Sequence, residues 1–187
     1  YWAFSELYRA DTAAMDQEAI SEMRRRWTNM VNFLQDAGTL SESFVNDQGG
    51  GMSESCHNYG AIPAYFLSSF VLGPRVTGPH GNRQLVIEPR PGDLTSASGT
   101  VVTDLGPVPV SWTKNNGTMQ FSCTVPPGKT ATLHLPVVGS TITLDGNVVN
   151  NPFIEGRHVI LPLSAGAHAL TAEPPPTTSR TIYEDTL

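Results

Sequence analysis

The stretch of residues 99–125, GTVVTDLGPVPVSWTKNNGTMQFSCTV, predicts the architecture of the second half of this chain. Apolar and polar residues alternate along its three runs, which is the pattern of strands with one buried face. Asn116-Gly117 separates the last two runs, and this dipeptide is a strong signal for a tight hairpin turn. The stretch therefore predicts consecutive antiparallel strands.

The same pattern continues on both sides of this stretch. Short alternating runs recur at intervals of roughly 8–12 residues and are separated by turn dipeptides such as Asp145-Gly146. Such spacing favours an antiparallel β-sandwich over residues 85–173. Eight strands are expected, at 85–88, 99–103, 108–114, 119–125, 130–135, 140–144, 159–163 and 167–172. A Pro-rich stop and a polar tail follow at 174–187.

Residues 1–73 have a different composition and a helical periodicity. Only one of the fifteen prolines, Pro63, lies among them. Three helices are expected, at 2–10, across 16–37 and at 59–72. The second has one apolar stripe with spacings of three and four, formed by Ile20, Met23, Trp27, Met30, Val31 and Leu34. The fold class is thus α+β, with helices first, a linker at 74–84 and the β-sandwich after it.

The third expected helix carries apolar residues on almost every face. Such a helix is typical of the interior of a larger body. Three helices cannot bury it well, so we expect that much of its packing surface comes from outside this chain.

Charge and composition exclude several classes of partner. The chain has 187 residues, a net charge of −6 and only two lysines, Lys114 and Lys129. Binding to nucleic acid or to an anionic membrane needs a surface rich in basic residues, and this composition excludes both. The five histidines have no metal-ligand spacing, and no phosphate loop is present. No cofactor and no metal site are expected.

A long segment without periodicity, 36–56, separates the second and third helices. Loops of this length inside a compact domain are usually functional or disordered. Around it lie groups that suit a sugar site, with carboxylates for proton transfer and polar and aromatic groups for the ring: Glu42, Glu54, His57, Asn58 and Tyr59. An ordinary acidic surface loop is the equally open alternative.

Trp112 and the two cysteines each allow either a structural or a functional interpretation. Trp112 is either a core residue of an alternating strand or a surface aromatic of a sugar-binding module. Cys56 and Cys123 are either buried free thiols or, for Cys56, a reactive thiol beside His57.

Four ordered patches resemble the C-terminal third of family-78 glycoside hydrolases, the α-L-rhamnosidases. They are residues 23–30 (MRRRWTNM), 38–44 (GTLSESF), 55–73 (SCHNYGAIPAYFLSSFVLG) and 87–112, which begins IEP and ends GPVPVSW. Each patch is weak alone, but their order and spacing together are fairly specific. The resemblance covers residues 1–145.

The resemblance implies the last helices of an (α/α)6 barrel followed by a terminal β-sandwich. It implies an inverting glycosidase that removes terminal α-L-rhamnose, with Glu42 as the general base. The substrate-binding residues would be His57, Asn58, Tyr59 and Glu54. The general acid would lie in an earlier barrel segment, so this chain alone is expected to be inactive. Where the family often has Trp, this chain has Tyr59, which leaves a related sugar open.

Two alternatives to a catalytic fragment are a carbohydrate-binding module and a β domain that only braces the barrel. The expected partners are a carbohydrate substrate and the N-terminal part of the same enzyme. An extracellular or periplasmic location follows only from the substrate class.

Overall fold

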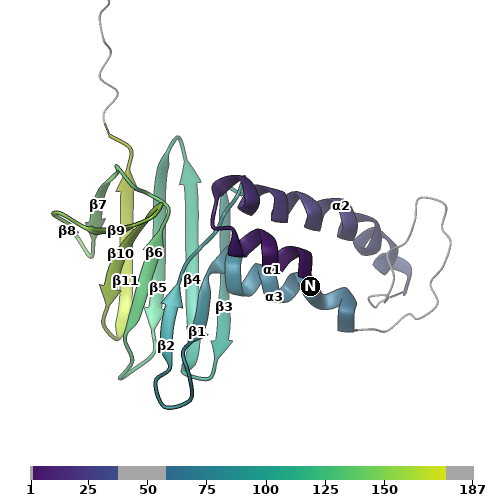
Figure 1. The fold of residues 1–187 in the computed structure, drawn as a ribbon, viewed down its shortest axis with the longest axis horizontal. Coiled ribbons are helices and arrows are strands. Elements are labelled where there is room, and N and C mark those ends of the chain that lie inside the picture. The colour runs from purple at the N-terminus through teal and green to yellow at the C-terminus, as the bar shows by residue number, and fades with distance from the viewer. Residues whose placement is uncertain (1, 38–57, 176–187) are drawn as a thin grey trace, which may run out of the picture.

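The computed structural model describes residues 2–37 and 58–175. A layer of helices stands against one side of a two-sheet sandwich (Figure 1). The helices are α1 (Trp2–Arg9), α2 (Ala13–Ala37) and α3 (Ile62–Phe66). A 3-10 turn, η1 (Asn58–Ala61), precedes α3, and a π-helical segment, η2 (Leu67–Leu72), continues it. None of the described helices is long and apolar enough to cross a membrane.

The break between α1 and α2 is set by two residues. Asp11 has a positive φ of 49°, which few L-residues other than Asn and Asp adopt. Thr12 then caps α2, because its Oγ1 accepts a hydrogen bond from the Met15 N–H at 3.2 Å. The helix expected at 2–10 is therefore present and ends just before this break.

The helices share an aromatic core of their own. Phe4 and Tyr8 of α1, Trp27 of α2 and Phe66 of α3 are all buried. The ring of Tyr8 stacks on that of Phe70 with 4.3 Å between centroids. The predicted stripe of α2 is buried at Ile20, Met23 and Trp27. Val31, predicted in the same stripe, is 52% exposed instead.

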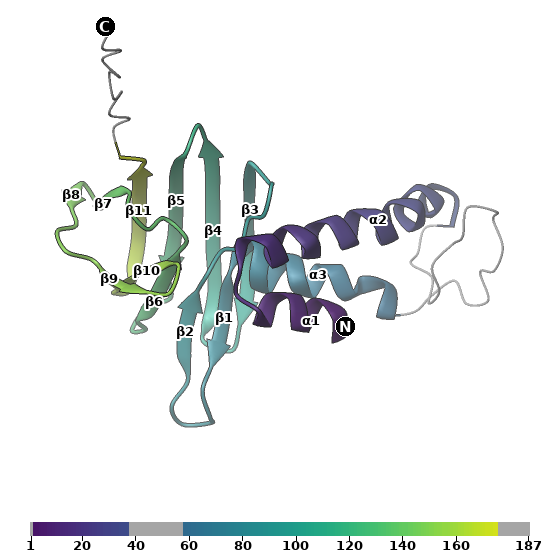
Figure 2. The ribbon, with the colours of Figure 1, turned by 45° about the horizontal axis from the view of Figure 1, so that its top comes forward.

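The sandwich consists of two sheets. One has the order β1 (Pro74–Thr77), β2 (Gln84–Ile87), β6 (Ala131–Leu135), β10 (His158–Leu163) and β9 (Phe153–Glu155). The other has the order β3 (Ser96–Thr103), β4 (Gly106–Asn115), β5 (Thr118–Val125), β11 (Gly166–Glu173), β7 (Thr141–Leu144) and β8 (Asn147–Val148). All eight predicted strands are present. Figure 2 shows the helical layer beside β1, β3 and β4.

Alternation along the strands builds the core between the sheets. In β4, Val108, Val110 and Trp112 are buried, and the residues between them are exposed. Leu133 and Leu135 of β6 face them from the other sheet and are fully buried. Burial contributes roughly 1.5–3 kcal/mol for each such aliphatic side chain, so this shared core is the main source of stability.

Three details differ from the expectations. β1 occupies residues 74–77, which were expected as linker, and pairs with β2 as an antiparallel hairpin. β2 pairs with β6 in parallel, so the sandwich is not wholly antiparallel. The third helix is divided into η1, α3 and η2 rather than being one regular helix. The domain boundaries themselves remain predictions.

Candidate functional site

Most of the predicted sugar-site residues lie outside the described part of the chain. Glu42, Glu54 and His57 belong to 38–57, as does Cys56. Asn58 and Tyr59 lie in η1, where the structure describes their backbone. Their predicted roles in sugar binding therefore remain predictions.

The described residues that follow this segment are attached to α2. The Trp27 indole Nε1 donates a hydrogen bond to the Gly60 carbonyl oxygen at 2.8 Å, which fixes η1 against α2. In Figure 2, the end of α2 and the start of α3 both lie at the end of the helical layer remote from the sheets. The helical layer thus holds both attachment points of the segment that carries Glu42.

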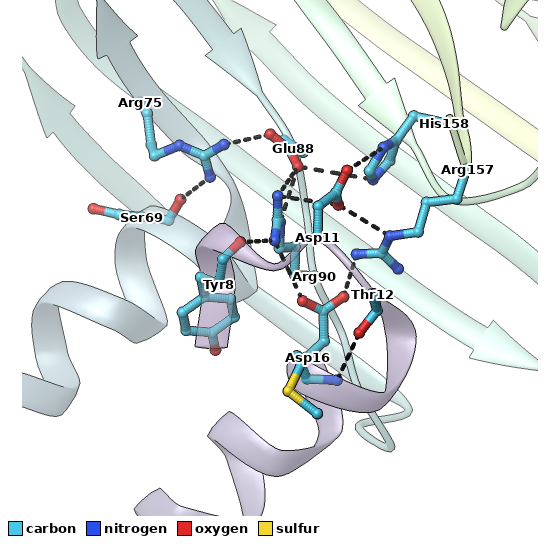
Figure 3. A network of polar contacts seen from close by, with 11 residues as sticks. Tyr8, Asp11, Thr12, Asp16, Ser69, Arg75, Glu88, Arg90, Arg157 and His158 are labelled. Carbon is cyan, nitrogen blue, oxygen red and sulfur yellow. Dashed lines mark hydrogen bonds and ion pairs between the residues drawn. The ribbon is translucent and has the colours of Figure 1, made fainter. Parts of the chain in front are cut away.

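A cluster of charged side chains lies at the opposite end of the helical layer, where it meets the sandwich (Figure 3). We call it the junction network. Its members are Asp11, Asp16, Arg75, Glu88, Arg90, Arg157 and His158. Asp11 lies between α1 and α2, Asp16 lies in the first turn of α2, and the others come from the sandwich. Three guanidinium groups face three carboxylates, so the network is balanced when His158 is neutral.

Arg90 is the centre of the network and is 6% exposed. Its Nε and Nη2 donate to Glu88 Oε1 at 2.9 and 2.5 Å. Its Nη1 donates to the Tyr8 carbonyl oxygen at the end of α1 and lies 3.5 Å from Asp16 Oδ1. One buried side chain therefore binds α1, α2 and the segment after β2 together.

Glu88 is held from two sides. Arg75 Nη2 donates to its second carboxylate oxygen, while Arg75 Nη1 donates to the Ser69 carbonyl oxygen of η2 at 2.9 Å. Burial acts to raise the pKa of Glu88. The guanidinium groups of Arg75 and Arg90 outweigh this effect, so the pKa lies below its usual range. Glu88 is thus ionised at neutral pH.

Arg157 contacts the network from the turn between β9 and β10, at the edge of their sheet opposite β1. Its Nε donates to Asp11 Oδ1 at 3.0 Å, and its Nη2 donates to Asp16 Oδ2. Asp16 is 1% exposed, so its carboxylate oxygens are hydrogen-bonded by these partners rather than by water. The first turn of α2 is therefore attached to the segment between β9 and β10.

His158 lies between two carboxylates at distances longer than a hydrogen bond. Its Nδ1 is 3.8 Å from Asp11 Oδ2, and its Nε2 is 3.7 Å from Glu88 Oε1. Nε2 is buried and has no hydrogen-bond partner among the described residues. Burial lowers the pKa of His158, although Asp11 and Glu88 oppose this. The ring is therefore neutral at neutral pH.

Asp11, Glu88 and His158 are close enough to be considered as metal ligands, with candidate ligand atoms within 4.8 Å of one another. The surrounding charges argue against a cation. Glu88 Oε1 already accepts from Arg90 at 2.5 Å, and Asp11 Oδ1 accepts from Arg157 at 3.0 Å. A divalent ion would lie beside two guanidinium groups, where repulsion is strong at low dielectric. The network therefore suits structural ion pairing rather than metal binding.

Sequence reasoning missed this network. Glu88 and Arg90 are two residues apart in an extended segment, so their side chains share a face, and this pair was the one local signal. Asp11, Asp16, Arg157 and His158 come from distant parts of the chain, and only folding brings them together.

Two other predicted candidates have clear positions. Trp112 is 1% exposed and packs in the sandwich core. The core interpretation is therefore correct, and Trp112 cannot serve as a surface aromatic for sugar. Cys123 is also buried, and burial raises the pKa of its thiol to about 12, so it is an unreactive free cysteine.

Comparison with known proteins identifies the β half. Residues 75–147 match the model of the bacterial α-L-rhamnosidase C-terminal domain. The match covers less than half of this chain. An α-L-rhamnosidase of Streptomyces avermitilis is 43% identical over 80 residues, which are 42% of this chain and 8% of that protein. The suspected relation to the C-terminal part of α-L-rhamnosidases is confirmed.

Solved α-L-rhamnosidases share the fold. The structure from Dictyoglumus thermophilum aligns with a TM-score of 0.62 at 21% identity, over 76% of this chain and 17% of that one. The Streptomyces avermitilis enzyme in complex with L-rhamnose aligns with a TM-score of 0.52 at 25% identity, over 68% of this chain and 13% of that one. The chain therefore spans less than a fifth of the length of these relatives.

The rhamnosidase C-terminal domain match divides the junction network. Arg75, Glu88 and Arg90 lie inside the matched segment, whereas Arg157 and His158 lie after it. Asp11 and Asp16 lie in the helical layer before it. Within the described residues, the network is thus one of the contacts that join the sandwich to the helices, and it includes residues from inside and outside the matched segment.

Proposed function

We propose that this chain is part of an inverting glycoside hydrolase that removes terminal α-L-rhamnose, or a related sugar, from glycosides or polysaccharides. The single observation that carries the proposal is the match of residues 75–147 to the α-L-rhamnosidase C-terminal domain. The fold of solved rhamnosidases over most of this chain supports it.

In this proposal, Glu42 is the general base and holds the attacking water. Inversion needs a second carboxyl group, the general acid, roughly 6.5–9.5 Å away on the other side of the sugar. The acid comes from the rest of the larger protein, so the isolated chain is inactive. His57, Asn58, Tyr59 and Glu54 bind the sugar.

The helical layer supports the presence of such a partner region. Three apolar residues of its helices are exposed: Val31 is 52%, Tyr65 49% and Leu67 43% accessible. Exposed large apolar groups on adjacent helices mark a surface that packs against another body. We infer that the remaining helices of the barrel cover this surface.

Within the same proposal, the described residues act as a brace. The junction network fixes the start of α2, and the Trp27–Gly60 hydrogen bond fixes η1 against the same helix. The second contact fixes the described residues that directly follow the segment that carries Glu42. Positioning of this kind is needed because small displacements of a catalytic group cost large factors in rate.

The test uses the longer enzyme that contains this chain, with an aryl α-L-rhamnoside as substrate. Glu42→Gln should lower kcat by about 10²–10⁴-fold, as expected for loss of a general base. Glu18→Gln is the matched control, because Glu18 is an exposed glutamate on α2. Its turnover should equal that of the unmodified enzyme. Near-normal turnover of Glu42→Gln would exclude Glu42 as the base.

A bracing role without catalysis by this chain is the second candidate, and the junction network favours it. It predicts that Glu42→Gln is silent in the longer enzyme while loss of Arg90 reduces both stability and activity. A sugar-binding module has less support from the described residues, because Trp112 is buried.

A further inference from the structure

A concave site lies where the sandwich meets the start of α2. A cavity of about 470 Å³ opens there between the β4–β5 turn, the segment after β2, the segment after β6 and the first turn of α2. In Figure 1, the β4–β5 turn is at the upper end of the sandwich, on the side of the sheets where α2 begins. This volume is within the range of about 300–1,000 Å³ that is typical of small-molecule sites.

The lining of the cavity is mainly apolar but contains no aromatic ring. Met119 and Val137 are 3% and 8% exposed, and Leu94 packs against the same core. Pro91 and Pro136 add two rigid rings. Small binding sites combine such apolar walls with a few fixed polar groups.

The charged groups of the lining balance each other. Arg157 is paired with Asp16, and Asp93 is paired with Arg24 at 2.5 Å. Lys114 donates from Nζ to the Gly92 carbonyl oxygen at 3.0 Å, and this is the one hydrogen bond that the described residues give its ammonium group. A lysine ammonium has three N–H donors. Donors thus remain for a ligand oxygen, while a lining without net charge offers an anion no compensation for its lost hydration.

Backbone geometry fixes the positions of the polar residues at the mouth of the cavity. Asn116 and Gly117 form the β4–β5 turn with positive φ values of 48° and 81°, and strands β4 and β5 fix both ends of this turn. The Lys114 backbone N–H donates to the Thr95 carbonyl oxygen at 2.7 Å. The side chains of Asn116 and Lys114 therefore start from rigid positions, which lowers the entropic cost of binding.

We propose that this cavity is an accessory binding site for a neutral saccharide unit. Its apolar wall meets the C–H groups of a sugar ring, and Lys114, Asn116 and Thr95 hydrogen-bond its hydroxyl groups. The site lies in a different part of the chain from Glu42, so it binds a sugar that the reaction does not cleave. The choice of L-rhamnose as the first probe rests on the proposed function, but the site itself does not.

The test is a titration of the 187-residue chain, labelled with ¹⁵N, with L-rhamnose and a panel of other neutral monosaccharides. Saturable changes are expected at the amide signals of Gly92, Asn116 and Gly117. Galacturonate, which carries a carboxylate, should bind more weakly than galactose. Saturable changes confined to residues outside the cavity, tighter binding of galacturonate, or no saturation at millimolar concentrations with any of these sugars would each overturn the proposal.

Two variants make the test specific. Lys114→Met should weaken binding by about tenfold or more, because it removes a charged hydrogen-bond donor. Asn116→Gly should also weaken it, and glycine keeps the positive φ of the turn. Lys129→Met, at the other lysine, is the matched control and should bind as the unmodified chain does. Equal affinity of all three variants would overturn the site even if the chain binds sugar.

The cavity proposal and the hydrolase proposal are tested by different measurements. The readout is binding at assigned amides of this chain, whereas the role of Glu42 is read from turnover of the longer enzyme. A silent Glu42→Gln leaves the cavity proposal standing, and an unresponsive cavity leaves the general base standing.

Discussion

Trp112 of β4 donates its indole N–H to the carbonyl oxygen of Val71 in η2 at 2.9 Å, inside the core. This bond joins the sandwich to the last turn of the helical layer. Both residues are almost fully buried. An unpaired carbonyl at this place would have no access to water, so the indole fixes how the last helical turn lies on the sheet.

We therefore expect Trp112→Phe to lower the free energy of unfolding by at least about 1–3 kcal/mol. The ring is smaller, and the Val71 carbonyl loses its buried donor. Urea denaturation followed by circular dichroism measures the change. Phe153→Leu is the control, because Phe153 is 66% exposed and should change stability by no more than about 0.5 kcal/mol. Equal effects of the two changes would contradict this account.

Arg90 provides a second prediction. Arg90→Met leaves Glu88 and Asp16 buried with fewer cationic partners, and breaking a buried ion pair on one side costs about 3–5 kcal/mol. Arg24→Met breaks the exposed pair with Asp93 and should cost at most about 1 kcal/mol. Denaturant midpoints of both variants measure the difference. A loss in Arg90→Met no larger than that in Arg24→Met would show that the network does not hold the two parts together.

The pH dependence of stability follows from two histidines with opposite shifts. His158 has a pKa lowered by burial, despite the opposing effects of Asp11 and Glu88. Its contribution to stability is present above the unfolded value of 6.5 and is lost as the pH falls through the lower folded value. His158→Gln should therefore reduce the loss of stability on acidification.

His168 is the matched control with the opposite sign. Burial acts to lower its pKa, but the hydrogen bond to Asp145 at 2.7 Å outweighs this and raises it. Its contribution is present below 6.5 and is lost as the pH rises through the folded value. Thermal midpoints between pH 5 and 8 should thus fall on the acid side because of His158 and on the alkaline side because of His168. Parallel profiles for both glutamine variants would contradict these assignments.

The sandwich could be predicted from sequence because local alternation and turn residues define each strand. Val108, Val110 and Trp112 alternate with exposed residues, and Asn116-Gly117 forms the expected turn. β9 was missed because its residues are exposed, including Phe153, so no buried face marks it. β1 was missed because Pro74 and the following glycines resemble a linker.

The junction network was beyond prediction for a different reason. Its charges are spread from Asp11 to His158, and a pattern within one segment cannot show which distant charges meet. Glu42, Glu54 and His57 were proposed from local composition and from the family resemblance, and they lie outside the described residues. Their roles stay predictions until the longer enzyme is tested.

Gly73 shows how closely the helical layer approaches the sandwich. It ends η2 with a positive φ of 104°, and its carbonyl oxygen accepts a hydrogen bond from the Glu88 N–H at 3.1 Å. A Cβ at this position would lie 2.5 Å from the Pro89 backbone nitrogen and 2.6 Å from the Glu88 carbonyl carbon. Neither backbone atom can move without disturbing Glu88 and hence the junction network.

Gly73→Ala should therefore destabilise the chain by about 3 kcal/mol or more, from the strained φ together with the clash. Gly81→Ala separates these two causes, because Gly81 has a φ of 90° with nothing within 4 Å of the added Cβ. It should cost only the strain, about 1–2 kcal/mol. Urea unfolding of both variants gives the difference. If Gly73→Ala costs no more than Gly81→Ala, the close approach at Gly73 does not constrain the junction, and the helical layer can shift on the sandwich.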